Sequence, residues 1–306
     1  MRALLLLSAV LLFSGCGAIH TALAERHFPP QGRFLPVGTG YAHYIRAGSG
    51  SPVVYIHGSL GSTRDLTDSP TFPLLTARYD VIAFDRPGFG YTRRPCRTAM
   101  SIEDHARALH GDLAALHLTE KPLLVGHSMG GAVALAYAEL YPDEIRGAVL
   151  LGGLAYPQGP PSALERLSAA PVLGDLFLQT IAQPLGALLG PGQFKRVFGP
   201  MPAPRGYERA VLALGLRPAE FRADSQDALL VNRSLERMIP RYPAIKVPLE
   251  ILQGELDKNV SPEDNAVRLH AVVPNSTLVM LPGVAHAVQF AAPQQVLHAV
   301  ERLLRH

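Results

Sequence analysis

The sequence has no tryptophan, only two cysteines and few charged residues. Charged side chains make up 17% of the 306 residues, and 28 basic against 25 acidic residues give a formal net charge of +3. No basic run is longer than Arg93-Arg94, so we expect no nucleic-acid partner. Low-complexity segments and obvious internal repeats are also missing. The hydrophobic fraction of 48% is that of a globular chain, long enough for one large domain with an insertion or for two domains.

A hydrophobic run long enough to span a membrane comfortably is missing at the N-terminus. The apolar run from Ala3 to Phe13 follows the positively charged Met1-Arg2 and is short, which favours a signal peptide over residues 1–15. The run ends in Phe13-Ser14-Gly15-Cys16, which resembles the lipobox of bacterial lipoproteins. The first lipobox position, here Phe13, is more often Leu. The resemblance implies cleavage before Cys16, lipidation of that cysteine and a membrane-anchored protein of the cell envelope. An ordinary signal peptide and an uncleaved anchor are the alternatives, and all three place the folded body outside the cytoplasm.

The two cysteines predict no structural disulfide. If Cys16 is lipidated, Cys96 has no partner within the chain. Cys96 is then either a reactive thiol or, as we favour, a small buried residue. Residues 16–32 contain Pro29-Pro30 and little periodicity, and we interpret them as a tether between membrane and domain.

Strand-like and helix-like segments alternate from residue 33 onward. Residues 101–118 have helical periodicity, with Ser101 as a plausible N-cap and Glu103 and Asp104 in the first turn. Short apolar runs are typical of strands buried in a parallel sheet. The predicted strands, of which the first two form an antiparallel pair, are 34–37, 41–45, 52–57, 80–85, 122–125, 145–151, 247–252 and 277–281. The alternation predicts an α/β fold with a mostly parallel sheet of about eight strands flanked by helices.

This alternation is interrupted once. Residues 157–242 are helical in pattern and rich in Pro and Gly, without convincing strands. We therefore expect a core domain formed by residues 33–156 and 243–306, with residues 157–242 as a helical cap over a pocket.

The stretch Gly126-His127-Ser128-Met129-Gly130 lies between a predicted strand and a predicted helix. A serine at such a turn, with small residues two positions before and after it, is the arrangement of a nucleophile elbow. The helix N-terminus favours negative charge developing near Ser128. The pattern G-x-S-x-G also occurs by chance in glycine-rich chains, so the other catalytic groups have to be found elsewhere.

A serine nucleophile needs a base, and the base needs a carboxylate partner. His286 follows the last predicted strand, on a loop at the edge of the sheet where the sites of α/β proteins gather. Asp257 follows the strand 249–252, and Glu255 is its nearest rival. We expect Asp257 to orient His286.

Two backbone N–H groups are needed to stabilise an oxyanion. Met129, directly after the nucleophile, supplies one. We expect the other from Ser59 in the loop after the strand 52–57, with Leu60 as the alternative.

Together these motifs resemble the α/β-hydrolase superfamily in its capped form. The matching stretches are His57-Gly58-Ser59, Asp85-Arg86-Pro87-Gly88-Phe89-Gly90, Gly126-His127-Ser128-Met129-Gly130-Gly131, Gly254-x-x-Asp257 and Gly283-x-x-His286. The order Ser, Asp, His along the chain is that of the family. The resemblance implies covalent hydrolysis through an acyl-enzyme. Because the nucleophile is Ser and not Asp, the chain does not resemble the epoxide hydrolases or haloalkane dehalogenases that carry the same cap.

The apolar cap favours an uncharged, fairly hydrophobic carboxylic ester as substrate. The same triad could instead act on an amide or peptide, on a C–C bond, or in cofactor-free perhydrolysis. A non-catalytic binding lipoprotein on a hydrolase scaffold is the hypothesis of another class. We expect no cofactor and no metal ion.

Overall fold

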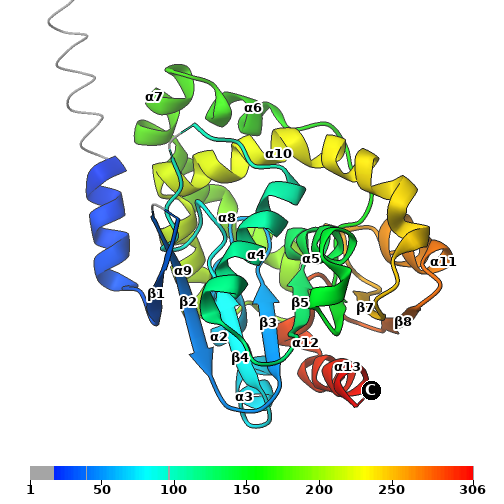
Figure 1. Ribbon diagram of the computed structural model, residues 1–306. Coiled ribbons are helices and arrows are strands. Elements are labelled where there is room, and N and C mark those ends of the chain that lie inside the picture. Colours follow the sequence, from blue (N-terminus) through cyan, green and yellow to red (C-terminus); the bar gives the residue numbers. More distant parts are fainter. Residues whose placement is uncertain (1–16, 39, 96, 306) are drawn as a thin grey trace, which may run out of the picture.

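The computed structural model describes residues 17–38, 40–95 and 97–305. Cys16 and Cys96 lie outside these residues, so the lipidation and thiol predictions stay predictions. Figure 1 shows a central sheet with helices on both faces and a layer of helices at one end.

The sheet has eight strands in the order β1-β2-β4-β3-β5-β6-β7-β8. The first two, β1 and β2, pair antiparallel, β2 pairs antiparallel with β4, and the remaining neighbours are parallel. The strands are β1 (Arg33–Val37), β2 (Gly40–Ala47), β3 (Pro52–Ile56), β4 (Asp80–Phe84), β5 (Leu123–His127), β6 (Gly147–Leu151), β7 (Leu249–Gly254) and β8 (Ser276–Leu281). The predicted α/β fold with about eight strands is therefore confirmed.

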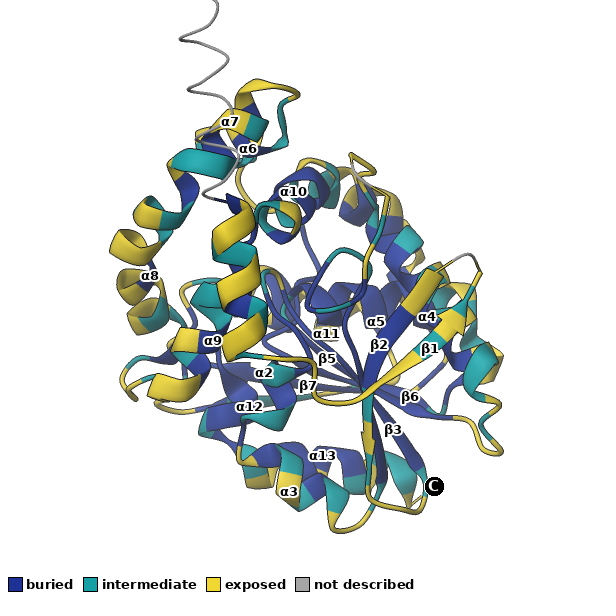
Figure 2. Cartoon of the chain, turned by 90° about the vertical axis from the view of Figure 1, so that its left-hand side faces the viewer, coloured by how far each residue is buried: buried dark blue, intermediate teal, exposed yellow. Residues whose placement is uncertain are grey.

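Alternate residues of the central strands face two separate apolar layers, as the period of two in a strand requires. In β3, Val54 and Ile56 pack with one buried cluster, whereas Val53 and Tyr55 pack with the other. The helices flanking the sheet are α2 (Arg64–Thr67), α3 (Thr71–Thr76), α4 (Ile102–Leu116), α5 (Met129–Leu140), α11 (Arg268–Val272), α12 (Val288–Ala291) and α13 (Pro293–Leu304). Figure 2 shows α3 and α13 on one side of the fanned strands and α4 and α5 on the other.

Helix α4 begins where the sequence predicts. Ser101 is its N-cap: the side chain accepts from the N–H of Asp104, whose carboxylate accepts from the N–H of Ser101 in a capping box. The helix ends at Leu116, two residues before the expected end, and its C-cap His117 adopts a left-handed conformation with φ of 49°.

Five α-helices connect β6 to β7, with no strand among them. They are α6 (Ala163–Ala169), α7 (Leu173–Thr180), α8 (Ala182–Phe198), α9 (Arg205–Gly215) and α10 (Pro218–Met238). Helix α10 crosses over the top of the sheet in Figure 1. We call α6–α10 the cap.

Residues 17–27, which we expected to have little regular structure as part of the 16–32 tether, form a helix. That expectation was wrong because one side of this helix packs against the cap. Arg217 of the cap donates to the Glu25 carboxylate at 2.9 Å, and His20 Nε2 lies 3.0 Å from the carbonyl oxygen of Ala213. Ala24 of the same helix is buried. Among the described residues, no helix has both the length and the apolar character that a membrane span needs.

Candidate active site

Ser128 lies at the sharp turn between β5 and α5. Its backbone has φ of 53° and ψ of −120°, a conformation that is unfavourable for a residue with a side chain. Three hydrogen bonds hold the turn: the Ser128 N–H donates to the Leu151 carbonyl (3.0 Å), and the Ser128 carbonyl accepts from Gly131 (2.9 Å) and Leu154 (3.0 Å). The turn therefore keeps the strained serine in place by bonding it to the neighbouring strand and the loop after it.

Two glycines make this turn sterically possible. A Cβ atom at Gly126 would lie 2.3 Å from the Gly130 carbonyl oxygen, and one at Gly130 would lie 2.1 Å from the Ile56 carbonyl oxygen. Neither position can accept a side chain without moving backbone. The small residues of the motif are thus needed by the close approach of α5 to β3 and β5.

The imidazole of His286 and the carboxylate of Asp257 form a buried pair. His286 follows β8, Asp257 follows β7, and the distance from Nδ1 to Oδ2 is 2.8 Å. The His286 N–H donates to the Val197 carbonyl at the end of α8, at 3.0 Å. The rival carboxylate, Glu255, is exposed to solvent.

Asp257 is surrounded by donors. Its carboxylate accepts from the N–H groups of Asn259 (2.8 Å) and Val260 (3.0 Å) and from the Gln253 side-chain amide (3.0 Å). Burial favours the neutral carboxyl, but the bond and charge of His286 and these backbone donors outweigh it and lower the pKa of Asp257. An ionised Asp257 can hold the Nδ1–H tautomer of His286 and leave Nε2 free to accept a proton.

His127, next to the nucleophile, has a structural part in the site. Burial and the nearby His286 lower the pKa of His127 to about 3, so its ring is neutral at ordinary pH. Its Nε2 lies 3.1 Å from the carbonyl oxygen of His286, to which it donates. This bond ties the loop of the base to the elbow.

Ser128 and His286 line the same cavity, together with Ser59, Leu60 and Met129. Within the described part of the chain, no hydrogen bond joins the Ser128 hydroxyl to His286. Such contacts are often long in enzymes without substrate and tighten when it binds.

The loop after β3 runs directly beside the nucleophile. A Cβ atom at Gly58 would lie 3.0 Å from that of Ser128. The Leu60 N–H donates to Asp224 of the cap at 3.1 Å. Among the described residues, the N–H of Ser59 has no hydrogen bond partner. The N–H of Met129 lies in the first turn of α5, where N–H groups have no partner within the helix. Of the two alternatives in this loop, Ser59 is therefore the one whose N–H is available.

A buried arginine that sequence reasoning did not single out supports this loop. The Arg86 side chain donates to the carbonyls of His57 (3.2 Å) and Gly58 (2.9 Å), and its N–H donates to Nε2 of His57 (2.9 Å). Burial and the charge of Arg86 keep the pKa of His57 well below its usual value, so the ring remains a neutral acceptor. Arg86 belongs to the Asp-Arg-Pro-Gly motif, which was the only signal in the sequence.

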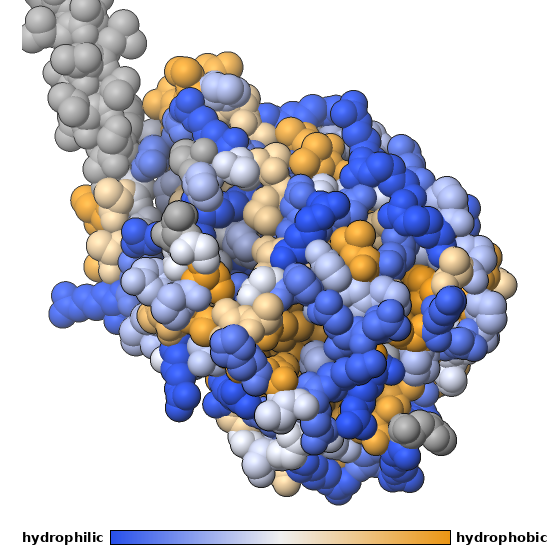
Figure 3. Space-filling view, in the orientation of Figure 1, coloured by the Kyte–Doolittle hydropathy of each residue, from blue (hydrophilic) through white to orange (hydrophobic). Residues whose placement is uncertain are grey.

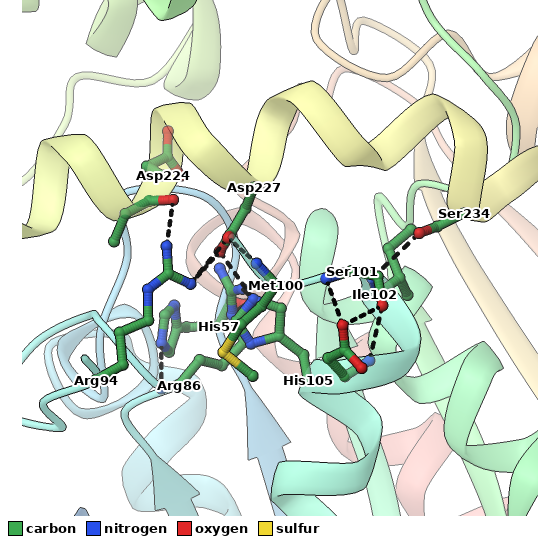
Figure 4. Close-up of polar contacts among 12 residues, drawn as sticks. His57, Arg86, Arg94, Met100, Ser101, Ile102, His105, Asp224, Asp227 and Ser234 are labelled. Atoms are coloured by element: carbon green, nitrogen blue, oxygen red, sulfur yellow. Dashed lines mark hydrogen bonds and ion pairs between the residues drawn. The ribbon is translucent and has the colours of Figure 1, made fainter. Parts of the chain in front are cut away.

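A second polar cluster joins the cap to the core (Figure 4). Asp227 on α10 accepts from Arg94 at 2.8 and 2.9 Å, from the N–H of Met100 at 2.8 Å and from Nε2 of His105 at 2.9 Å. Asp227 and His105 are both buried. These bonds fix α10, and with it the roof of the cavity, over the sheet.

The cavity has a volume of about 540 Å³ and is mostly apolar. The cap supplies most of its walls, among them Phe177, Leu185, Leu189, Phe194, Leu212 and Phe221. Within the described residues, no group of three or more histidine, cysteine or carboxylate side chains is arranged as a metal site.

Residues 51–293 match the family model described as alpha/beta hydrolase fold. The chain is 31% identical over 252 residues to 2-hydroxymuconate semialdehyde hydrolase of Pseudomonas sp. strain CF600, which covers 76% of this chain and 87% of that protein. It is 26% identical over 277 residues to haloalkane dehalogenase 2 of Mycobacterium tuberculosis, covering 89% of this chain and 94% of the dehalogenase.

Solved structures show the same fold. A membrane phospholipase A, described as a bacterial virulence factor, superimposes with a TM-score of 0.70 at 20% identity over 100% of this chain and 98% of its own. A thermophilic esterase from Thermogutta terrifontis gives a TM-score of 0.66 at 21% identity over 90% and 98%. With the family match covering most of its length, the chain belongs to the α/β-hydrolase family and is a hydrolase.

Proposed function

We propose that this hydrolase cleaves an uncharged, fairly hydrophobic carboxylic ester through an acyl-enzyme. One observation carries the proposal: Ser128, on its strained turn, shares an apolar cavity with the buried His286–Asp257 pair. Two of the similar solved structures, a phospholipase A and an esterase, support the same class of bond.

The proposed reaction has two steps. Ser128 Oγ attacks the ester carbonyl carbon while Nε2 of His286 takes its proton, and the carbonyl oxygen becomes an oxyanion held by the N–H groups of Ser59 and Met129. As the tetrahedral intermediate collapses, the C–O bond to the alcohol breaks and His286 returns the proton to the leaving oxygen. Water then gives a proton to His286 and attacks the acyl carbon. The C–O bond to Ser128 breaks and His286 returns the proton to Oγ, which releases the acid and restores Ser128.

Labelling with a fluorophosphonate tests the nucleophile. We expect the full chain to be labelled at Ser128 and to release p-nitrophenol from short and medium acyl esters. A Ser128→Ala variant should lose both properties. Ser225 also lines the cavity, so Ser225→Ala is the matched control and should keep them. Labelling that persists in Ser128→Ala would contradict the proposal, and a folded parent chain without any label would favour the non-catalytic lipoprotein.

A substrate panel tests the bond. Esters, anilides, a diketone and peracid formation from hydrogen peroxide should be compared at equal enzyme concentration. We expect the highest kcat/KM with esters of neutral, apolar acids, because the cavity walls are apolar. A higher value for an anilide or a diketone would keep the triad but replace the ester by that bond.

We also propose that the protein is exported and anchored in the cell envelope through a lipid on Cys16. The support is the sequence alone: Met1-Arg2, the apolar run to Phe13, and the lipobox-like residues before the cysteine. Cys16→Ser should release the protein from the membrane fraction, while Cys96→Ser, the control at the other cysteine, should not. Unchanged attachment of Cys16→Ser would point to an uncleaved anchor or to attachment through the cap.

A further inference from the structure

Large aliphatic side chains gather on the outer surface of the cap. On α7, α8 and the residues next to them, six side chains are exposed, of which Leu188 is 75% exposed and Val172 71%. The six are Val172, Leu173, Leu176, Ile181, Leu188 and Leu189. Exposed apolar residues are ordinary when they are scattered singly, but a contiguous group indicates a contact surface.

The helix of residues 17–27 continues this surface. Its residues Ile19 and Leu23 are 61% and 49% exposed. The start of the helix touches α7, since a Cβ atom at Gly17 would lie 1.8 Å from the Gln179 side chain. Figure 3 shows apolar residues both over α7 at the top and over this helix at the left, and Figure 2 shows exposed residues along α7 and α8. We call these eight exposed aliphatic side chains, six in the cap and two on 17–27, the apolar cap face.

The charged residues around α8 are basic. Residues 176–207 contain no Asp or Glu but include Lys195, Arg196 and Arg205. The acids nearest to the face, Glu25 and Asp175, are paired with arginines. Basic residues beside an apolar surface are attracted to the anionic head groups of a bilayer.

The order of the chain favours lipid over protein as the partner of this face. In the sequence, helix 17–27 directly follows Cys16, the residue that we expect to carry the lipid.

The apolar cap face adjoins the mouth of the active-site cavity. Leu189 and Gln193 of α8 are exposed to solvent and also line the cavity, whose wall continues inward through Leu185 and Gly186. A molecule that enters beside Leu189 therefore passes from the apolar cap face into the cavity.

We propose that the apolar cap face binds the surface of a lipid bilayer and turns the cavity mouth toward it. The face is a second membrane contact, in addition to the lipid proposed on Cys16. Together with the ester chemistry proposed above, on which this consequence rests, it makes membrane-resident acyl lipids the substrate class. Their acyl chains then reach Ser128 from the bilayer without first being exposed to water.

The absence of tryptophan from the chain allows a direct test of docking. A Leu188→Trp variant of the full chain carries a single tryptophan on the apolar cap face. Val272→Trp places it on α11, at the opposite side of the molecule in Figure 1, where Val272 is also exposed. Both proteins are incorporated in vesicles of phosphatidylethanolamine and phosphatidylglycerol, with and without brominated acyl chains.

We expect brominated lipid to quench the fluorescence of Leu188→Trp and to leave that of Val272→Trp unchanged. Equal fluorescence of Leu188→Trp in both kinds of vesicle would overturn the proposal. So would an emission shift that depends on protein concentration and not on lipid, since it would assign the face to a second copy of the chain. The readout does not involve catalysis, so its failure is distinct from a failure of the Ser128 chemistry.

A second test links docking to substrate. The double variant Leu173→Ser/Leu188→Ser alters neither the triad nor a residue that lines the cavity. Losing the burial of one leucine weakens binding by roughly tenfold to a hundredfold, so hydrolysis of vesicle lipid should fall at least about tenfold. Hydrolysis of a soluble short-chain ester should stay the same. Val267→Ser/Val272→Ser, on the opposite side, should match the parent, and equal loss with both substrates or in both double variants would contradict the proposal.

Discussion

The hydrogen bond between Asp224 of the cap and the N–H of Leu60 gives the sharpest prediction about catalysis. Leu60 has φ of 49°, a left-handed conformation that costs a residue with a side chain about 1–2 kcal/mol. The bond from its N–H to a carboxylate contributes about 1.5–3 kcal/mol and offsets that cost. Without the bond, we expect the Ser59–Leu60 peptide to relax and to pull on the adjoining Gly58–Ser59 peptide, against its bond to Arg86, so that the N–H of Ser59 leaves its position beside Ser128.

Asp224→Ala should therefore act on the transition state. Loss of one oxyanion donor reduces kcat by about 10²–10³-fold, while KM for a short ester should change little because the ground-state carbonyl depends less on the donor. The assay belongs at about pH 8, since burial raises the pKa of Asp224 to about 6 and the carboxylate must be ionised for the full bond. Asp224→Asn keeps an acceptor oxygen and should retain most of the activity.

Two results would refute this reasoning. If kcat of Asp224→Ala equals that of the parent, Asp224 does not position the loop. If Asp224→Ala is faster than the parent, the N–H of Leu60 is the oxyanion donor and Asp224 competes for it. An Asp224→Asn variant as slow as Asp224→Ala would assign the effect to charge.

Three further predictions concern the turn, pH and the cap. Gly130→Ala should prevent formation of the turn, because its Cβ would lie 2.1 Å from a carbonyl oxygen. Gly159→Ala, which has open space around the new methyl group, should be neutral. Expression and activity of the two variants test this prediction. Burial raises the pKa of Asp112 to about 7, above its value of 3.8 in the unfolded chain, so its contribution to stability is lost as pH rises from about 4 to 7. Asp112→Asn should thus raise the free energy of unfolding by a few kcal/mol at about pH 8 and have little effect at about pH 4. Urea titrations at the two pH values measure this difference. A gain in stability that is the same at both pH values would contradict the raised pKa of Asp112. Asp227→Ala should lower the free energy of unfolding by about 3–5 kcal/mol, because it leaves the buried Arg94 side chain without its carboxylate. Hydrogen exchange should then be faster in α10 than in α5. Equal exchange in both helices would mean that the bond does not hold the cap.

Much of the fold could be predicted from local patterns. Buried parallel strands are continuous apolar runs, and β3, β4, β5, β6 and β7 are buried along their whole length. A helix start is also a local feature, which is why Ser101 could be recognised as an N-cap. Residues 17–27 could not be assigned in this way, because their helix packs on cap residues nearly two hundred positions later.

The site residues were predicted from their place at the ends of strands. In a parallel sheet, the loops after β3, β5, β7 and β8 meet at one edge, so the motifs that follow these strands converge. Because Ser128, Asp257 and His286 each lie a few residues after a predicted strand, the sequence alone indicates that they come together. These assignments of role remain predictions until the variants are measured.

The choices between near neighbours needed the tertiary structure, because they depend on the direction in which a group points. Leu60 and Ser59 are adjacent, but only the N–H of Leu60 meets Asp224, which lies 164 positions away. Asp257 and Glu255 belong to one loop, yet the first is buried against His286 and the second faces solvent. The apolar cap face also needed the tertiary structure. The sequence shows that the cap helices are apolar, but only their packing decides which of those side chains line the cavity and which remain exposed at its mouth.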